Sequence, residues 1–314
     1  MNQFYSDVVK GLSSNPKYLL SKYFYDDAGD VIFEKIMRSP DYYLTRCELS
    51  IFKDQTQQLI EAFDAGSAQY DIVELGAGDA LKTSHLLRYL VQNGKEFTYY
   101  PIDISKQVIQ KLEMHLPRQI PWLQVTGLNG EYFPMLEEAG RLSGRKKVVL
   151  FLGSNIGNMY PREAQEFCRQ LNGMLMPGDI LLMGADLKKH PETILKAYND
   201  EEGLTREFNL NLLRRMNSEL DADFDVSAFQ HFQTYDPGTG SCKSYLISLA
   251  DQEVTIGSEK KVFYFSENES IFTEVSQKYS PGELGALAES AGFTSLAQFF
   301  DSRSWFTDVI WGKV

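Results

Sequence analysis

The residues most suggestive of chemistry lie in the segment DIVELGAGDALKT, residues 71–83. An apolar strand-like run reaches the acid Glu74, and Gly76 and Gly78 then form a turn into a helical pattern. A nicotinamide fingerprint would continue as G-x-G-x-x-G, but Leu81 occupies the third glycine position. A phosphate loop of the form G-x-x-x-x-G-K-[ST] does not occur there either. The segment therefore predicts a nucleotide-binding turn that is not built around a phosphate.

A second acid follows the next strand-like run. Asp103 comes directly after FTYYPI, residues 97–102. In a doubly wound sheet, a carboxylate at this place accepts hydrogen bonds from ribose hydroxyls. S-adenosylmethionine has a ribose and no phosphate, so the two acids and the glycine turn predict a methyltransferase. A Rossmann-like core with an inactive site is the alternative interpretation of the same residues.

Strand-like and helix-like patterns alternate around these motifs. Apolar residues at helical spacing separate the strand-like runs. The runs are residues 70–75, 97–102, 122–125, 147–152 and 179–185. Alternation of this kind predicts the α/β class, with a parallel sheet covered on both faces.

Both ends of this region carry further signals. Residues 45–48, TRCE, form a capping-box pattern before an apolar helical stripe. Pro281 and Gly292 bound a predicted helix, and residues 305–311 alternate like a strand. We therefore expect the α/β region to resume at the C-terminus.

The stretch from about 186 to 278 has a different pattern. A long helical segment is followed by residues 241–249 and 261–265, which are typical of antiparallel strands. This stretch is expected to be an insertion between the fifth strand and the last helix.

Bulk properties exclude several classes of protein. A formal net charge of -12 argues against a nucleic-acid partner, because phosphate binding needs a basic face. Three scattered cysteines predict reduced thiols in the cytoplasm, and no Cys/His spacing predicts a metal site. The N-terminus lacks a signal-peptide core, and no apolar run is long enough to span a membrane.

Four separated motifs resemble the histidine Nα-methyltransferases of ergothioneine biosynthesis. They occur in the family's order and cover nearly the whole chain. They are residues 22–48, 151–161, 197–225 and 272–280. The resemblance implies a Rossmann-like S-adenosylmethionine methyltransferase domain and a second, α+β substrate-binding domain. The N-terminal segment and the insertion would form the second domain.

The implied boundaries follow the pattern changes described above. The methyltransferase domain would comprise residues 46–188 and 279–314, and the substrate-binding domain residues 1–45 and 189–278. The implied partner is a small-molecule substrate, an amino acid. The oligomeric state is left open.

The resemblance assigns the substrate carboxylate to neutral polar groups. Asn158 follows the fourth strand-like run, and its side-chain amide would donate to the carboxylate, as would the Tyr198 hydroxyl. Gly153, in the same motif as Asn158, is also implied to line the substrate site.

The resemblance assigns the imidazole to Glu274 and Ser276. These residues are two apart in a strand pattern, so their side chains point to the same face. A carboxylate and a hydroxyl on one face can bind the two ring nitrogens.

Tyr25, Tyr42 and Phe33 are implied to surround the substrate amine. The amine becomes a fixed cation as methyl groups accumulate, and aromatic faces stabilise such cations by roughly 0.5 to 2 kcal/mol each. Tyr25 and Tyr42 are expected to orient the amine for attack. Lys82 matches the family's KT pair after the glycine turn and is implied to contact the carboxylate of the methyl donor.

Two places depart from the family pattern. Leu128 and Asn129 stand where an acidic–aromatic pair is expected near adenine, so Glu131 or Tyr132 would have to replace it. Ser244 stands where a larger apolar residue is expected near the substrate, which would widen the site.

The predicted activity is therefore S-adenosylmethionine-dependent trimethylation of the histidine α-amine, which yields hercynine. One alternative is N-methylation of another aromatic amino acid or derivative. A second, from a different class, is a regulator that binds S-adenosylmethionine without turnover. A nucleotide-dependent oxidoreductase is disfavoured by Leu81.

Overall fold

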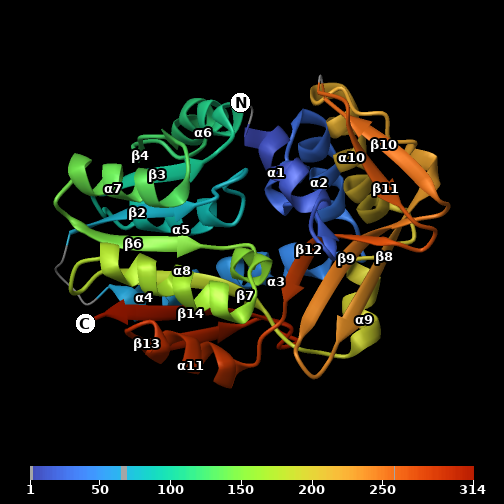
Figure 1. Cartoon of the computed structure of the whole chain (residues 1–314). Helices are drawn as coiled ribbons and strands as arrows, with labels where there is room; N and C mark the ends of the chain where they lie inside the picture. The colour runs from blue at the N-terminus through green and yellow to red at the C-terminus, as the bar shows by residue number, and fades with distance from the viewer. Residues whose placement is uncertain (1–2, 65–68, 258) are drawn as a thin grey trace. The chain divides into compact units, whose positions relative to one another are not determined.

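The computed structural model describes residues 3–64, 69–257 and 259–314 (Figure 1). The chain forms two compact units. Unit 1 comprises residues 1–43 and 189–276, and unit 2 comprises residues 44–188 and 277–314. The domain boundaries expected from the sequence differ from these by at most two residues at each junction.

Unit 2 is built on an eight-stranded sheet in the order β13-β14-β7-β6-β2-β3-β4, with β5 beside β3. The strands are β2 (Tyr70–Leu75), β3 (Thr98–Asp103), β4 (Gln124–Val125), β5 (Leu128–Asn129), β6 (Lys146–Phe151), β7 (Ile180–Asp186), β13 (Phe293–Phe300) and β14 (Phe306–Lys313). Neighbouring strands from β7 to β4 are parallel, whereas β14 is antiparallel to both β7 and β13. This is a Rossmann-like α/β fold with an antiparallel edge.

The strand order reverses at β2, which has β3 on one side and β6 on the other. In open α/β sheets, ligands bind at such a switch point, outside the carboxyl ends of the strands. The segment with Gly76 and Gly78 leaves β2 at this place.

Helices cover both faces of the sheet. They are α3 (Tyr43–Asp54), α4 (Thr56–Phe63), α5 (Thr83–Gln92), α6 (Lys106–Gln119), α7 (Tyr132–Leu142), α8 (Pro161–Met174) and α11 (Pro281–Ser290), with the short helix η2 (Asn155–Asn158) after β6. In β2, Val73 and Leu75 point into a core shared with α7, α8 and α11. The alternate residues Ile72 and Glu74 are buried on the other face, because successive strand side chains point to opposite sides.

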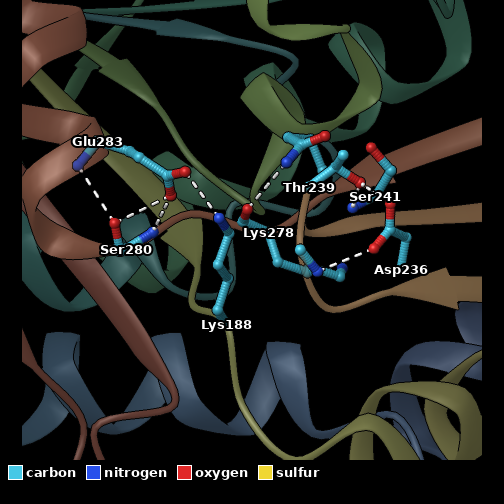
Figure 2. A network of polar contacts seen from close by, with 9 residues as sticks. Lys188, Asp236, Thr239, Ser241, Lys278, Ser280 and Glu283 are labelled. Atoms are coloured by element: carbon cyan, nitrogen blue, oxygen red, sulfur yellow. Dashed lines mark hydrogen bonds and ion pairs between the residues drawn. The ribbon is translucent and has the colours of Figure 1, made fainter.

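Local sequence explains where the last helix begins. Ser280 caps α11, and its hydroxyl accepts from the backbone N–H of Glu283. Glu283 in turn accepts from the Ser280 backbone N–H at 2.7 Å and from the Lys188 ammonium at 2.6 Å (Figure 2). This reciprocal capping confirms the predicted start at Pro281.

Two element predictions in unit 2 were wrong in detail, and one strand was not predicted. TRCE does not cap a helix, because α3 already begins at Tyr43, a buried residue. The strand expected at 122–125 is reduced to β4, since Trp122 is exposed and has a φ of 75°. Strand β13 was not predicted, and most of its residues lie at least partly exposed at the sheet edge.

Unit 1 has a four-stranded sheet in the order β1-β12-β9-β8 and a separate hairpin, β10-β11. Its strands are β1 (Lys17–Tyr18), β8 (Phe229–Asp236), β9 (Ser241–Ser248), β10 (Gln252–Ile256), β11 (Lys261–Phe265) and β12 (Ser270–Gln277). Its helices are α1 (Gln3–Leu12), α2 (Asp27–Arg38), α9 (Pro191–Ala197) and α10 (Leu204–Glu219), with the short helices η1 (Ser21–Phe24) and η3 (Val226–Ala228). The two antiparallel strands expected from the sequence are present, although β9 pairs with β8 and β11 with β10.

The core of unit 1 gathers around α10. Leu212, Leu213 and Met216 of this helix are fully buried and belong to one apolar cluster with residues of α1, α2 and the strands. Over the described ranges 3–64, 69–257 and 259–314, no helix combines the length and the apolar character needed to cross a membrane.

Candidate active site

The glycine turn after β2 is held against β3. The Gly76 backbone N–H donates to the Ile102 carbonyl at 2.8 Å, and Gly76 has a φ of 74°, which favours glycine. A Cβ at this position would lie 2.9 Å from the Tyr132 hydroxyl and 3.3 Å from Asn155 Nδ2. A Cβ on Gly78 would meet nothing within 4 Å. The turn is therefore crowded at its first glycine and open at its second.

Asp103 stands beside the open part of the turn. Its Oδ2 accepts from the Gly78 backbone N–H at 3.2 Å, and its Oδ1 accepts from the Ser105 backbone N–H at 2.8 Å. Burial raises the pKa of Asp103 above its ordinary value. A carboxylate offers about four lone-pair sites, so the two oxygens retain acceptor capacity for ribose hydroxyls.

Glu74 lies beneath the turn and is buried. Its carboxyl group accepts from Thr83 Oγ1 at 2.8 Å and from the Tyr99 hydroxyl. Burial raises the pKa of Glu74 to about 7. Because both oxygens bind groups within the protein, Glu74 connects β2, β3 and the start of α5.

Tyr132 and Asn155 complete the surroundings of Gly76. Tyr132 begins α7, and its ring packs edge-on against Phe151 at a centroid distance of 5.9 Å. Burial, together with the charge of Asp103, raises the pKa of Tyr132 to about 12. Tyr132 was one of two residues expected to replace the missing acidic–aromatic pair. Asn155 was not predicted, although it belongs to the motif at residues 151–161.

Lys82 forms an ion pair with Glu48 of α3. Glu48 is fully buried and also accepts from the Gly153 backbone N–H, at 2.8 Å and 3.0 Å to its two oxygens. Sequence reasoning missed Glu48, because the TRCE pattern was interpreted as a helix cap.

Asn158 is exposed at the end of η2, the short helix that follows β6. Unit 2 thus brings seven predicted residues together near the carboxyl ends of its central strands. Glu74 lies just beneath this edge, and the other six lie at it. The seven residues are Glu74, Gly76, Gly78, Lys82, Asp103, Gly153 and Asn158.

Unit 1 arranges its predicted aromatic residues in a continuous series. The ring centroids of Tyr25 and Phe33 are 5.6 Å apart, those of Phe33 and Tyr42 are 6.4 Å apart, and those of Tyr42 and Tyr198 are 6.2 Å apart. All three contacts are edge-on, which is a favoured geometry for aromatic pairs. Phe208 of α10, which was not predicted, packs against Tyr25 and Phe33.

The backbone around Tyr25 is fixed by its neighbour. Asp26 caps α2, and its Oδ1 accepts from the Gly29 backbone N–H at 2.7 Å and from Asn211 Nδ2 at 2.8 Å. Tyr25 remains 37% exposed, so part of its surface is open to contact another molecule.

Tyr198 connects the aromatic series to β12. Its hydroxyl lies 2.7 Å from Ser276 Oγ, and both groups are buried. Glu274 precedes Ser276 by two residues within β12, which confirms the strand that the sequence predicted. Ser244 is buried in β9, and its carbonyl accepts from Thr273 Oγ1 at 3.0 Å.

The described residues contain no group of three or more His, Cys, Asp or Glu side chains that could hold a metal ion. The residues around the turn are chemically compatible with S-adenosylmethionine: the Asp103 carboxylate retains acceptor capacity beside the turn, the turn is open at Gly78, and an ammonium lies beside Gly153.

Comparisons with known proteins agree with this geometry. Residues 4–313 match the family described as "Histidine-specific methyltransferase, SAM-dependent". The histidine N-alpha-methyltransferase of Mycobacterium tuberculosis is 34% identical, over 96% of this chain and 90% of that protein. Ergothioneine biosynthesis protein 1 of Neurospora crassa is 28% identical, over 90% of this chain and 32% of that protein. The N-methyltransferase fsqC of Aspergillus fumigatus is 27% identical, over 93% and 78%. The chain belongs to the family of S-adenosylmethionine-dependent, histidine-specific methyltransferases.

Proposed function

We propose that this enzyme transfers three methyl groups from S-adenosylmethionine to the α-amine of histidine and releases hercynine. Family membership and the names of the relatives support this activity. The observation in the structure that carries the proposal is the aromatic series in unit 1, which ends at the Tyr198–Ser276 hydrogen bond next to Glu274.

Unit 2 is proposed to bind the methyl donor. Asp103 accepts from the ribose hydroxyls, and Lys82 binds the carboxylate of the methionine portion. Gly76 and Gly78 let the backbone approach the ligand closely. Tyr132 is proposed to contact adenine, because its hydroxyl reaches the turn and its ring lies near Asp103. Glu74 supports the turn from below, because its two oxygens accept from Thr83 and Tyr99 within the protein.

Unit 1 is proposed to recognise histidine by its ring and its amine. Glu274 and Ser276 bind the imidazole nitrogens, and Tyr25 and Tyr42 orient the α-amine with Phe33 behind them. The Tyr198 hydroxyl is proposed to donate to the carboxylate, and Asn158 and Gly153 keep the substrate role that their motif implies. No basic residue is required for the carboxylate, since neutral donors suffice.

The chemistry needs alignment more than acid–base catalysis. S-adenosylmethionine supplies a methyl group that is already activated by its sulfonium. The enzyme must hold a neutral amine with its lone pair directed at that methyl, and alignment alone can account for several kcal/mol of the barrier, on the order of 7 or more in favourable cases. Tyr25 and Tyr42 provide hydroxyls for orientation and ring faces for the growing positive charge.

N-methylation of another aromatic amino acid is the second candidate. It is favoured by the small Ser244 in β9 and by the similarity to an N-methyltransferase that is not named for histidine. Non-catalytic binding of S-adenosylmethionine is disfavoured by membership of an enzyme family. We propose a cytoplasmic location, because the three cysteines are free thiols and are buried.

An amino-acid panel tests the proposal. The enzyme is incubated with S-adenosylmethionine and one amino acid at a time, and release of S-adenosylhomocysteine is measured. Histidine should give the fastest turnover, and phenylalanine, tyrosine and tryptophan should react at least about 100-fold more slowly, because a polar site rejects analogues that leave its groups unpaired. Faster reaction with tryptophan or tyrosine would favour the second candidate, and no turnover with any amino acid would favour a binding protein.

A further inference from the structure

We propose that Glu48 is a positioning residue for the methyl donor. It fixes the Lys82 ammonium and the Gly153 backbone N–H, so that Lys82 binds the carboxylate of the methionine portion. The inference rests on the proposed role of Lys82. It assigns a function to a residue for which the sequence predicted no binding role, although Glu48 ends the motif at residues 22–48.

Three separate segments converge on the Glu48 carboxylate. Glu48 comes from α3, Lys82 immediately precedes α5, and Gly153 follows β6. The carboxylate pairs with the ammonium and accepts the Gly153 N–H through both oxygens. The Glu48 side chain is 1% exposed, whereas the Lys82 side chain is 19% exposed. The Glu48 carboxylate is thus almost fully buried, and part of the Lys82 side chain stays exposed.

Gly153 lies close to the Lys82 ammonium. A Cβ built on this glycine would be 3.5 Å from Lys82 Nζ, and Gly153 itself is exposed at the edge where ligands bind. An ammonium has three donors, of which Glu48 takes one. A donor therefore remains for an anionic group placed beside Gly153.

A second acid, Asp308, is buried close to Glu48. Asp308 of β14 is fully buried beside Gly184, where a Cβ would overlap Glu48 Oε1 and approach Asp308 Oδ1 to 3.1 Å. Within the part of the chain that the structure describes, neither Asp308 oxygen has a hydrogen-bond partner. Burial and the Glu48 charge raise the pKa of Asp308 well above its ordinary value, which favours the neutral carboxyl group.

The charges of this cluster then balance. With Asp308 in its neutral form, the Lys82–Glu48 ion pair contributes one charge of each sign. Burial alone would lower the pKa of the Lys82 ammonium, but the Glu48 charge raises this pKa above its ordinary value. Without Glu48, a partly buried lysine would lose both its fixed orientation and the group that keeps it protonated.

Two ligands separate this role from a merely structural one. S-adenosylhomocysteine carries the amino-acid portion, and 5′-methylthioadenosine shares its adenosine and thioether but lacks that portion. Calorimetric titration of Glu48→Gln should show binding of S-adenosylhomocysteine weakened on the order of tenfold or more, the scale of a lost charge-assisted hydrogen bond. Binding of 5′-methylthioadenosine should stay within about twofold of wild type, because this ligand makes no use of Lys82.

Glu283 provides the matched control. It accepts from the same two kinds of donor, a backbone N–H and a lysine ammonium (Figure 2). In contrast to Glu48, its side chain is 46% exposed. Glu283→Gln should leave the affinity for both ligands unchanged. Glu48→Asp keeps the charge but shortens the side chain, so it should give an intermediate loss for S-adenosylhomocysteine alone. Thermal unfolding checks that each variant is folded.

A double-mutant cycle tests whether Glu48 acts through Lys82. In a Lys82→Met background, Glu48→Gln should change the affinity for S-adenosylhomocysteine by less than about twofold. Additive losses in the double variant, or equal losses for the two ligands in Glu48→Gln, would overturn the proposal. Failure of methyl transfer to histidine with these binding results intact would instead refute the proposed function and leave the role of Glu48 standing.

Discussion

Asp103 is the residue whose surroundings define the proposed ribose site. Its carboxylate accepts from the N–H groups of Gly78 and Ser105, which fixes its orientation at the end of β3. Asp103→Asn should weaken S-adenosylmethionine binding by roughly 1 to 3 kcal/mol, because an amide loses a charge-assisted acceptor. Calorimetry measures this directly.

Asp79 of the same turn serves as the control for Asp103. It is exposed and accepts from the Leu81 N–H at 3.0 Å. Asp79→Asn should leave the affinity nearly unchanged. Equal affinities for wild type and a folded Asp103→Asn variant would count against the ribose assignment.

Glu274 carries the proposed selectivity for imidazole. Glu274→Ala should raise the KM for histidine at least about tenfold and leave S-adenosylmethionine affinity unchanged, since a site that hydrogen-bonds its substrate loses most when those groups are removed. Glu253→Ala, at an exposed position of β10, is the control. If wild type and Glu274→Ala discriminate histidine from phenylalanine equally well, the imidazole role is wrong.

At the scale of elements, Glu74 links β2, β3 and α5 through a buried carboxyl group. Its pKa is raised from 4.5 to about 7, with burial as the largest cause. The folded protein therefore binds more protons than the unfolded chain between about pH 4.5 and 7. The stabilisation from this group is complete below pH 4.5 and is lost as the pH rises towards 7.

Glu74→Gln should remove this contribution to the pH dependence. In wild type, one such group lowers the free energy of unfolding by up to about 1.4 kcal/mol per pH unit in this window. Urea denaturation at several pH values gives the difference in the free energy of unfolding between wild type and the variant. The contributions of other titrating groups, which the two proteins share, cancel in this difference. If this difference in the free energy of unfolding stays constant between pH 4.5 and 7, Glu74 is already ionised in the folded state over this range.

The same elements show what local sequence can predict. β2 was predicted to the residue, and α11 was predicted with Pro281 in its first turn, because an apolar run and a proline at a helix start are strong local signals. β13 was missed because an edge strand need not carry a continuous apolar run. The start of α3 was predicted too late in the chain. Tyr43 and Leu44 extend the helix towards its N-terminus, because both side chains are buried in the fold.

At the scale of the whole molecule, the substrate residues followed from motifs that resemble a family. The residues that contact these functional residues could not be predicted in the same way, because they come from distant parts of the chain. Glu48 and Lys82 are 34 residues apart, and Phe208 of α10 packs on Tyr25 and Phe33. Such pairs leave no periodic or local pattern, so a single sequence could not reveal them.

The number and position of the methyl groups test the central claim most directly. Wild-type enzyme is incubated with histidine and excess S-adenosylmethionine, and the products are followed by mass spectrometry with fragmentation. Neutral polar groups and tyrosine rings around the amine should let it lose its proton between transfers, whereas a carboxylate beside it would keep it protonated. We therefore expect three successive methyl additions, all on the α-nitrogen. A reaction that stops at one or two methyl groups, or that methylates the ring, would contradict trimethylation of the histidine amine.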